Sequence, residues 1–316
     1  MQLDSAILAD IDCLCSFALA AAEHRYVRPV VDDTTVLEIS QGRHPVIETQ
    51  MPPGEEYVPN DIELDTERQQ IIILTGPNMA GKSALLRQTA LIVLMAQVGC
   101  FVPADSAHVG MVDKIFTRVG ASDNISAGES TFMLEMSEAS NILNNMTGNS
   151  LVIFDELGRG TSTFDGISIA WAIAEYLHEG PKGHPRTLFA THYHELTSME
   201  QEIPEIRNFN IAVKKRQGEM IFLRKIVPGA ADDSYGVEVA KLAGLPDKLI
   251  ARARAVLKEL ESGAPKAPAI QKQTSDQVSL MDLQADAIRE KLAAIQVETL
   301  TPIEAMNVLY QLKQLL

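Results

Sequence analysis

The chain has 316 residues, and 46% of them are hydrophobic, which is enough for a sizeable buried core. Acidic side chains (42) outnumber basic ones (27), and the formal net charge is −15. This balance excludes a broad nucleic-acid-binding surface on the chain, because nucleic-acid phosphates are bound by concentrated basic side chains. At this length we expect roughly two domains.

The cysteines and the N-terminal segment exclude several other classes of protein. Cys13, Cys15 and Cys100 form neither a disulfide framework nor a zinc-ligand spacing. Residues 1–10 contain two acids and no basic residue, unlike the basic start of a signal peptide. The longest apolar run, residues 6–22, is interrupted by aspartates and does not read as a membrane span. We therefore expect a cytoplasmic protein with no membrane contact.

Strand and helix patterns alternate over most of the chain. Residues 3–25 have apolar positions at helical spacing, and short β-rich runs follow at 36–39 and 71–74. Further strands are expected at 115–119, 151–154 and 187–191, helices at 84–98, 130–145 and 167–177, and a β-hairpin at 211–227 around Gly218. This alternation predicts an α/β fold with a mixed, largely parallel sheet flanked by helices.

The C-terminal part is expected to be helical. A helix-turn-helix is predicted within residues 232–262, where Gly244 and Pro246 end the first helix. Residues 263–285 lack periodicity and carry two prolines, which favours a flexible linker. Residues 286–316 form a small helical unit whose last helix opens on a capping box. Because so small a unit cannot bury a core alone, we expect it to pair with another copy or to pack on the main domain.

A complete phosphate-binding loop, Gly-x4-Gly-Lys-Ser, lies between an apolar run and a helix pattern. Its glycines let the backbone wrap around phosphate oxygens, and the helix that follows offers unpaired N–H groups. Lys82 can reach the β- and γ-phosphates, and Ser83 can hold a magnesium ion. The nucleotide-binding residues are predicted to be Gly76, Pro77, Asn78, Met79, Ala80, Gly81, Lys82 and Ser83. The sequence thus predicts a nucleoside triphosphate site.

Two acids follow the apolar run 151–154, in a Walker B pattern. They lie at the carboxyl end of a buried strand, where open α/β sheets bind their ligands. Asp155 is placed to hold magnesium, and Glu156 is placed to polarise an attacking water. The alternative, a solvated acid pair at a strand end, is disfavoured because the phosphate loop and the acid pair occur together.

Three further features are candidates for the same site. His192 ends the next strand and can donate a hydrogen bond to the γ-phosphate, although a structural histidine is the alternative. The segment 158–163 starts beside the catalytic acid and is suited to carrying contacts between two nucleotide sites. Ser130 begins a helix and is either an ordinary cap or part of a second phosphate site. Because the loop already fills that role within one chain, we expect Ser130 to act in trans across a dimer.

The motifs in this order resemble the ATPase region of the MutS family of bacterial DNA mismatch repair proteins. The segments that carry the resemblance are Thr75-Gly-Pro-Asn-Met-Ala-Gly-Lys-Ser83, Ser130-Thr-Phe-Met-Leu-Glu-Met136, Asp155-Glu-Leu-Gly-Arg-Gly-Thr-Ser-Thr163 and Thr191-His-Tyr-His-Glu-Leu196, with Gly42-Arg-His-Pro-Val46 and Ser234-Tyr-Gly236 in support. The resemblance implies an ABC-type P-loop ATPase that uses ATP and Mg²⁺ and works as a homodimer with two composite sites. It also implies catalytic roles for Glu156 and His192, and stacking of Tyr57 on adenine.

The resemblance also implies an organisation and a set of partners. Residues 1–28 resemble the end of a lever helix, 29–231 the ATPase domain, 232–262 a dimerisation element and 286–316 an oligomerisation unit that could form tetramers. Domains that read mismatched double-stranded DNA are expected upstream, and a MutL-type repair protein is the expected partner. Localisation is then cytoplasmic, at the nucleoid during repair. Gln277–Leu283 resembles the short peptides that dock on the bacterial sliding clamp.

Two departures and three alternatives stay open. The family usually has Gly at Ala80 and Thr at Ala84; an alanine at position 80 would be strained if its φ had to be positive. The module could therefore be a non-catalytic nucleotide-binding dimerisation unit. It could also be an ABC-type ATPase of another DNA-processing or transport machine. The basic second helix of the helix-turn-helix, with Lys248, Arg252, Arg254 and Lys258, could bind DNA phosphates instead of a partner subunit.

Overall fold

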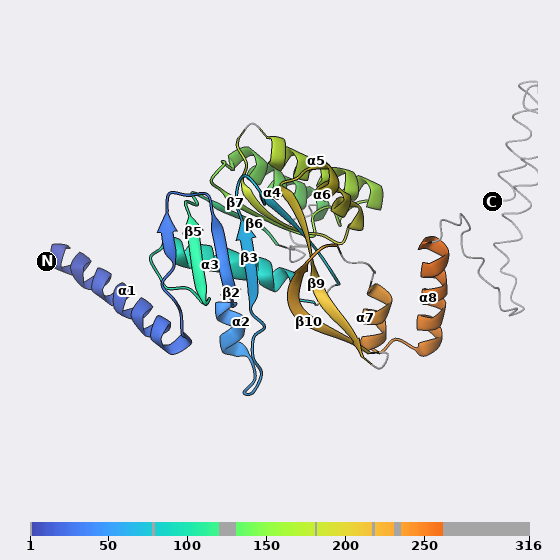
Figure 1. Ribbon diagram of the computed structural model, residues 1–316, viewed down its shortest axis with the longest axis horizontal. Coiled ribbons are helices and arrows are strands. Elements are labelled where there is room, and N and C mark those ends of the chain that lie inside the picture. The colour runs from blue at the N-terminus through green and yellow to red at the C-terminus, as the bar shows by residue number, and fades with distance from the viewer. Residues whose placement is uncertain are drawn as a thin grey trace, which may run out of the picture. The chain divides into compact units, whose positions relative to one another are not determined.

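The computed structural model describes residues 2–77, 80–119, 131–180, 182–216, 219–230 and 235–261. The chain divides into two units, Met1–Arg254 and Ala255–Leu316. Several expectations concern parts outside the described residues: Asn78, Met79, Ser130, Gly218, the linker with Gln277–Leu283, and the C-terminal helices. The described part is a mixed α/β structure with two sheets flanked by helices (Figure 1).

The larger sheet has six strands in the order β10-β9-β4-β8-β7-β6. Their bounds are β4 Ile71–Thr75, β6 Ile115–Arg118, β7 Leu151–Asp155, β8 Arg186–Ala190, β9 Ile206–Arg216 and β10 Glu219–Pro228. All neighbours are parallel except β9 and β10, which form the predicted hairpin. Every residue of β4, β7 and β8 is buried. Strands covered on both faces have continuous apolar runs, which explains why sequence patterns located them correctly.

The larger sheet is the mixed, largely parallel sheet that was predicted, but a second sheet was not predicted. Four strands, β1 Val30–Asp32, β5 Ser106–Gly110, β2 Leu37–Gly42 and β3 Asn60–Leu64, form it in that order. In β2 and β3 buried and exposed residues alternate, because one face of this sheet meets the core and the other meets water. Polar residues on the exposed face leave too few apolar residues for a strand signal in β3 and β5.

Helices cover both faces of the larger sheet (Figure 1). The helix after the phosphate loop, α3 Lys82–Gln97, packs in one core cluster with Ile72 and Leu74 of β4 and with the smaller sheet. Helices α4 Thr131–Asn145 and α5 Thr163–Glu179 pack on the opposite face, in a second cluster with Ile71 and Ile73. Successive residues of one strand thus face different layers. This sandwich fixes the strand ends that carry the candidate site.

The remaining elements are short or peripheral. They are α2 Pro45–Gln50, the 3-10 helix η2 His194–Ser198, α6 Met199–Glu202, and the helix-turn-helix pair α7 Gly236–Leu242 and α8 Asp247–Glu261. The two helices lie within residues 232–262, where a helix-turn-helix was predicted, and its role as a dimerisation element stays a prediction. Leu242, Leu245 and Leu249 are exposed on it.

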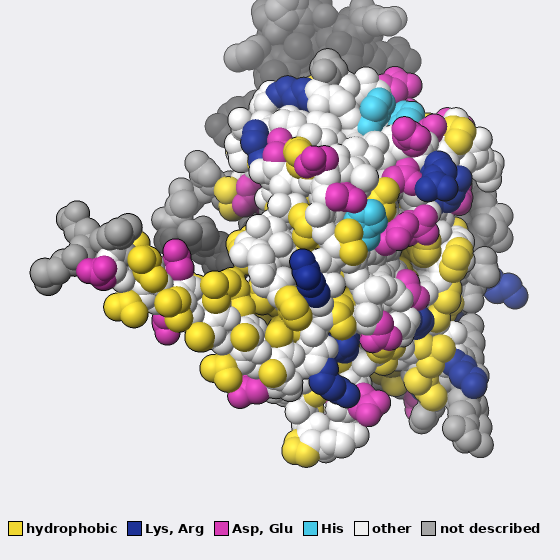
Figure 2. Space-filling model, turned by 60° about the vertical axis from the view of Figure 1, so that its left-hand side comes forward, with side chains coloured by type: hydrophobic (Ala, Val, Ile, Leu, Met, Phe, Trp, Pro, Cys, Tyr) yellow, Lys and Arg dark blue, Asp and Glu magenta, His cyan; other side chains and the backbone are white. Residues whose placement is uncertain are grey.

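The N-terminal helix α1 Gln2–His24 is confirmed and carries exposed hydrophobic side chains, seen as yellow atoms along the projecting helix in Figure 2. Residues Asp4–His24 have the length and composition of a membrane span, and none of them is buried. Asp10 and Asp12 lie within this segment, and each aspartate at a bilayer centre costs about 3 kcal/mol. The exposed face therefore suits another protein segment better than lipid.

Candidate functional site

The phosphate-binding loop connects β4 to α3 through two left-handed glycines, Gly76 (φ 136°) and Gly81 (φ 111°). Any side chain would be strained at these two φ values. Ala80 is fully buried, and its methyl group packs in the core cluster that contains α3. The expectation that Ala80 strains the loop depends on the φ of this residue and stays a prediction.

Lys82 lies beneath the loop, with its side chain 4% exposed. Its Nζ atom donates to the carbonyl oxygens of Gly76 (2.6 Å) and Pro77 (3.2 Å). The same atom lies 3.5 Å from Oε1 of Glu156. Burial lowers the pKa of the amine, while Glu156 and Asp155 oppose that shift. A buried ammonium held by loop carbonyls is placed to bind an anion entering the loop.

Asp155 and Ser83 form the part of the site that fits a magnesium ion. The Ser83 hydroxyl hydrogen-bonds to the Asp155 carboxylate, and burial raises the pKa of that carboxyl group. Its Oδ1 atom is buried and has no partner within the described residues. A buried, unpartnered carboxylate oxygen beside a hydroxyl suits a hard cation, which takes one or two protein oxygens and fills its other positions with phosphate and water.

Glu156 follows in a left-handed conformation (φ 59°), and its N–H donates to the Ala190 carbonyl at 2.8 Å. The carboxylate is held by two cations. Oε1 faces Lys82, and Oε2 lies 2.5 Å from Nη1 of Arg159. Positive φ at a residue other than glycine is a sign of local strain, and such strain is concentrated at functional sites.

His192 is linked to Glu156 by Arg159, which contacts both side chains. The Arg159 Nε–H donates to Nδ1 of His192 at 3.3 Å. Burial, and then the charge of Arg159, lower the pKa of His192 to about 4. The imidazole is therefore neutral near pH 7, and because Nδ1 accepts, the ring hydrogen is on Nε2. His192 can thus donate one hydrogen bond from Nε2.

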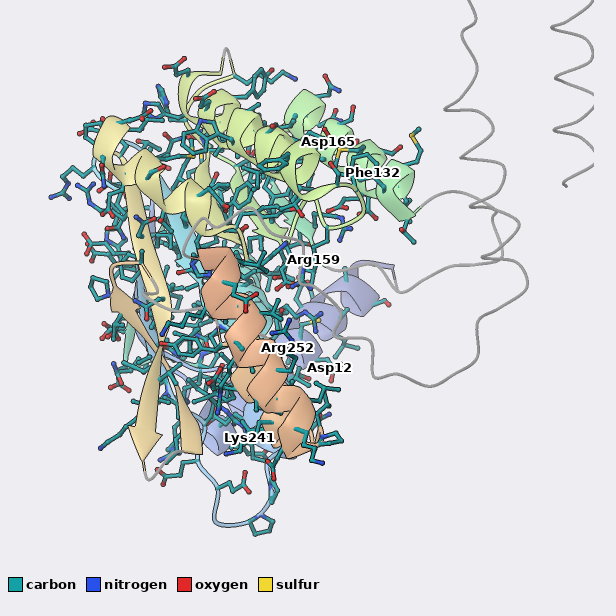
Figure 3. The ribbon with its side chains drawn as sticks, turned by 90° about the vertical axis from the view of Figure 1, so that its right-hand side faces the viewer. Asp12, Phe132, Arg159, Asp165, Lys241 and Arg252 are labelled. Carbon is teal, nitrogen blue, oxygen red and sulfur yellow. The ribbon has the colours of Figure 1, made fainter. Side chains whose placement is uncertain are left out.

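The segment after Glu156 contacts α4 and the residues that follow β8. The Gly158 N–H donates to Oε1 of the buried Glu135 at 2.8 Å, and its carbonyl accepts from the Tyr193 hydroxyl at 2.8 Å. A Cβ on Gly160 would lie 2.8 Å from the Cβ of Phe132. Figure 3 shows Phe132 on α4 and Asp165 on α5, with Arg159 below them. The segment is thus a close-packed turn rather than a free loop.

Tyr57 is half-buried, in the segment that precedes β3. Its hydroxyl donates to Oε1 of Gln88 on α3 at 2.9 Å, and burial raises the pKa of the phenol to about 12. The hydroxyl therefore stays protonated at neutral pH, and the ring is tied to the helix that begins at Lys82.

Comparisons with known protein families show which family the chain belongs to. The model described as MutS domain V matches residues 72–261, and that of the DNA mismatch repair protein MutS C-terminal region matches residues 283–315. The chain belongs to the MutS family. It is 56% identical to the DNA mismatch repair protein MutS of Parabacteroides distasonis and 57% identical to that of Bacteroides fragilis, in both cases over the whole chain and 38% of the relative. It is 53% identical to that of Flavobacterium johnsoniae, over the whole chain and 37% of the relative.

The chain thus spans little more than a third of these MutS relatives. The described structure brings together the predicted Lys82, Ser83, Asp155 and Glu156, which follow or end β4 and β7 on either side of β8. His192 is linked to them through Arg159. Tyr57 contacts Gln88 on α3 instead of these residues. Sequence analysis did not single out Arg159, Glu135, Tyr193 or Gln88 for a role. The first three lie in quoted motifs, but nothing in the spacing indicated their contacts.

Proposed function

We propose that this chain is the ATP-binding and ATP-hydrolysing module of a MutS-family DNA mismatch repair protein, with an ABC-type P-loop fold. The observation that carries the proposal is the arrangement of side chains at the carboxyl ends of β4 and β7, on either side of β8. There the loop lysine, the Ser83–Asp155 pair and Glu156 face one another within ion-pair and hydrogen-bond distance. A phosphate loop beside a strand-end acid pair is the arrangement that phosphoryl transfer from a nucleoside triphosphate requires.

Each residue has a defined task in this proposal. Lys82 binds the β- and γ-phosphates, while Gly76 and Gly81 let the loop backbone approach them. Ser83 and Asp155 hold Mg²⁺, which when bound neutralises charge developing on the phosphates. Glu156 accepts a hydrogen bond from the attacking water and orients it. The neutral His192 donates from Nε2 toward the γ-phosphate.

Two ion pairs surround Glu156, where the attacking water is proposed to bind. Both of its oxygens face cations, Lys82 and Arg159. A carboxylate oxygen accepts more than one hydrogen bond, so water can bind beside these contacts or replace one of them. A triphosphate favours replacement, because it offers Lys82 a more highly charged partner than Glu156.

The working unit is proposed to be a homodimer with composite sites. Ser130 of one subunit completes the nucleotide site of the other, and α7 and α8 supply the dimerisation element. Three exposed leucines on this element support a protein contact. Arg254, one of the basic residues that could bind DNA, is instead paired with Glu238 at 3.3 Å. This pairing favours dimerisation over DNA binding.

The wider partners follow from the family. Mismatched DNA is bound by upstream domains, a MutL-type protein receives the signal, and the C-terminal helices extend dimers to tetramers. Gln277–Leu283 docks on a sliding clamp. The protein acts in the cytoplasm, at the nucleoid during repair, and its partners do not include a membrane. Nucleotide state is coupled through dimer geometry to mismatch binding.

Two alternative functions, a non-catalytic nucleotide-binding module and an ABC-type ATPase of another machine, have less support. A non-catalytic module was suggested by Ala80, but its methyl group packs in the core and replaces no group that the proposed chemistry uses. An ABC-type ATPase of another machine is disfavoured by the family match across both parts of the chain.

Measurements of ATP binding and of ATP turnover distinguish a hydrolysing module from a non-catalytic one. Glu156→Gln is expected to bind Mg·ATP as the original chain does and to lose turnover, because the amide orients water poorly. Lys82→Met is expected to lose binding itself. Lys114→Met is the matched control, since Lys114 is exposed and donates to Asn145 far from the loop. Unchanged turnover in Glu156→Gln would refute the proposed catalytic role.

A further inference from the structure

Gln88 is a buried polar side chain that the proposed chemistry does not use. It lies in the second turn of α3 and is 0% exposed. Its Oε1 accepts the Tyr57 hydroxyl at 2.9 Å. Its Nε2 is buried without a partner within the described residues. A glutamine left partly unsatisfied in a core costs stability, so a role beyond packing would account for it.

Gly42 shapes the space around this amide. A Cβ built on Gly42 would lie 2.7 Å from Nε2 of Gln88 and 2.7 Å from a side-chain carbon of Ile39. Only a residue without a side chain lets β2 approach the glutamine this closely. The side chain of Gln88 is therefore confined on one side by β2 and directed on the other toward Tyr57.

The backbone that follows Tyr57 is held independently. Asn60, 3% exposed, donates from Nδ2 to the Arg224 carbonyl at 2.9 Å and accepts the Ile226 N–H at 2.8 Å. Lys225 donates to the Pro59 carbonyl at 2.9 Å. These bonds join residues 59 and 60 to the bulge in β10. The segment is thus fixed through the Asn60 side chain and the Pro59 carbonyl, and the ring of Tyr57 is held through its hydroxyl.

We propose that Gln88 is a positioning residue for nucleotide base recognition, because it holds the ring of Tyr57 in place as a preformed stacking platform. The inference rests on the proposed function and on the family resemblance, which implies that Tyr57 stacks on adenine. A ring that is already immobilised loses less rotamer freedom on binding than a free ring does. Gln88 therefore raises affinity for the nucleoside part of ATP and leaves affinity for the triphosphate part unchanged.

The test compares Mg·ATP with magnesium tripolyphosphate, which lacks the base, by calorimetry on the full 316-residue chain. Gln88→Met removes the acceptor with little change in side-chain length. Tyr57→Phe removes the donor and keeps the ring. Each variant is expected to weaken ATP binding about fivefold, and the double variant no more than either single one, because both break the same bond. Tripolyphosphate binding is expected to stay unchanged.

Thr89→Val is the matched control at the next position. Thr89 is equally buried, but its hydroxyl bonds only to the Leu85 carbonyl of its own helix among the described residues. This variant is expected to change the ratio of ATP to tripolyphosphate affinity by less than about twofold, within the error of ordinary core substitutions. If Gln88→Met does not fold, Tyr57→Phe alone tests the inference. It breaks the same hydrogen bond by removing the hydroxyl of the half-buried tyrosine.

Several results would overturn the inference. Equal loss of ATP and tripolyphosphate binding in Gln88→Met would mean that the residue acts on the phosphate loop through α3. Unchanged ATP binding, or additive losses in the double variant, would mean that the bond does not position the ring. If the original chain bound ATP no better than tripolyphosphate, base recognition by Tyr57 would be refuted, and the proposed phosphate site would not be affected. Binding of neither would refute the proposed function itself.

Discussion

Arg159 contacts both Glu156 and His192 through one guanidinium group: Nη1 lies 2.5 Å from the Glu156 carboxylate, and Nε donates to the imidazole at 3.3 Å. A planar fork can bridge two groups in this way, whereas a lysine ammonium is a point charge on a flexible stem. The arginine thereby orients the proposed water-activating acid and sets the tautomer of the proposed γ-phosphate donor.

Arg159→Met is expected to lower turnover at saturating ATP by about tenfold, because Glu156 and His192 lose their common support. Its charge helps to lower the pKa of His192, so the pKa rises in this variant. The acid limb of the pH–rate profile should therefore move to higher pH. Arg159→Lys keeps the charge and should move the limb less. Superimposable profiles for the three proteins would show that Arg159 does not act on His192.

His192 also links stability to pH. In the unfolded chain it titrates near 6.5, and in the folded protein near 4. The folded protein therefore binds fewer protons in this window, and stability falls as pH is lowered from about 6.5 to 4. Because the ring is only half-buried, solvent screening reduces the effect to about 1 kcal/mol. Urea unfolding at about pH 7.5 and 4.5 should show a larger loss for the original chain than for His192→Gln; parallel losses would contradict the assignment.

Asp155→Asn is expected to change stability and magnesium binding in opposite directions. Burial raises the pKa of this carboxyl group, so its charge is unfavourable in the folded state. The neutral amide should add about 1 kcal/mol to the free energy of unfolding. The Mg²⁺ concentration needed for half-maximal ATP binding should rise about tenfold, because an amide oxygen is a weaker ligand than a carboxylate. A variant that is less stable, or whose magnesium requirement is unchanged, would argue against a metal role.

Arg186 supports the scaffold rather than the chemistry. It is 0% exposed and donates to the carbonyl oxygens of Thr35, Met111 and Asn149, which lie in three separate segments. Arg186→Met leaves these acceptors without their donor and should cost about 3–5 kcal/mol. Arg68→Met, at a side chain that is 79% exposed, should change stability by less than about 0.5 kcal/mol. Urea unfolding measures both, and a small loss at Arg186 would contradict its bridging role.

The parts of the site that follow strands of the larger sheet were predictable from sequence. Strands β4 and β7 are buried on both faces and have unbroken apolar runs. The residues after them therefore fall at a known edge of the sheet. This is why Lys82, Ser83 and Asp155 were assigned together.

The contacts that refine the site were not predictable. Gln88 and Tyr57 are 31 positions apart, and Arg159 and His192 are 33 apart. Such pairs are set by how α3 and the turn after β7 pack, and local periodicity does not record that packing. The second sheet was missed for a related reason, because its short strands alternate charged and apolar residues and give a weak signal.

The most direct test of the account is complementation between two inactive chains. Glu156→Gln should fail to hydrolyse ATP, and Ser130→Arg should bind ATP without hydrolysing it. In an equimolar mixture, the heterodimer has one site with the Glu156 of one chain and the Ser130 of the other. Random pairing then restores about a quarter of the original turnover per chain. A mixture as inactive as its components would contradict a composite ATPase site built from two copies of this chain.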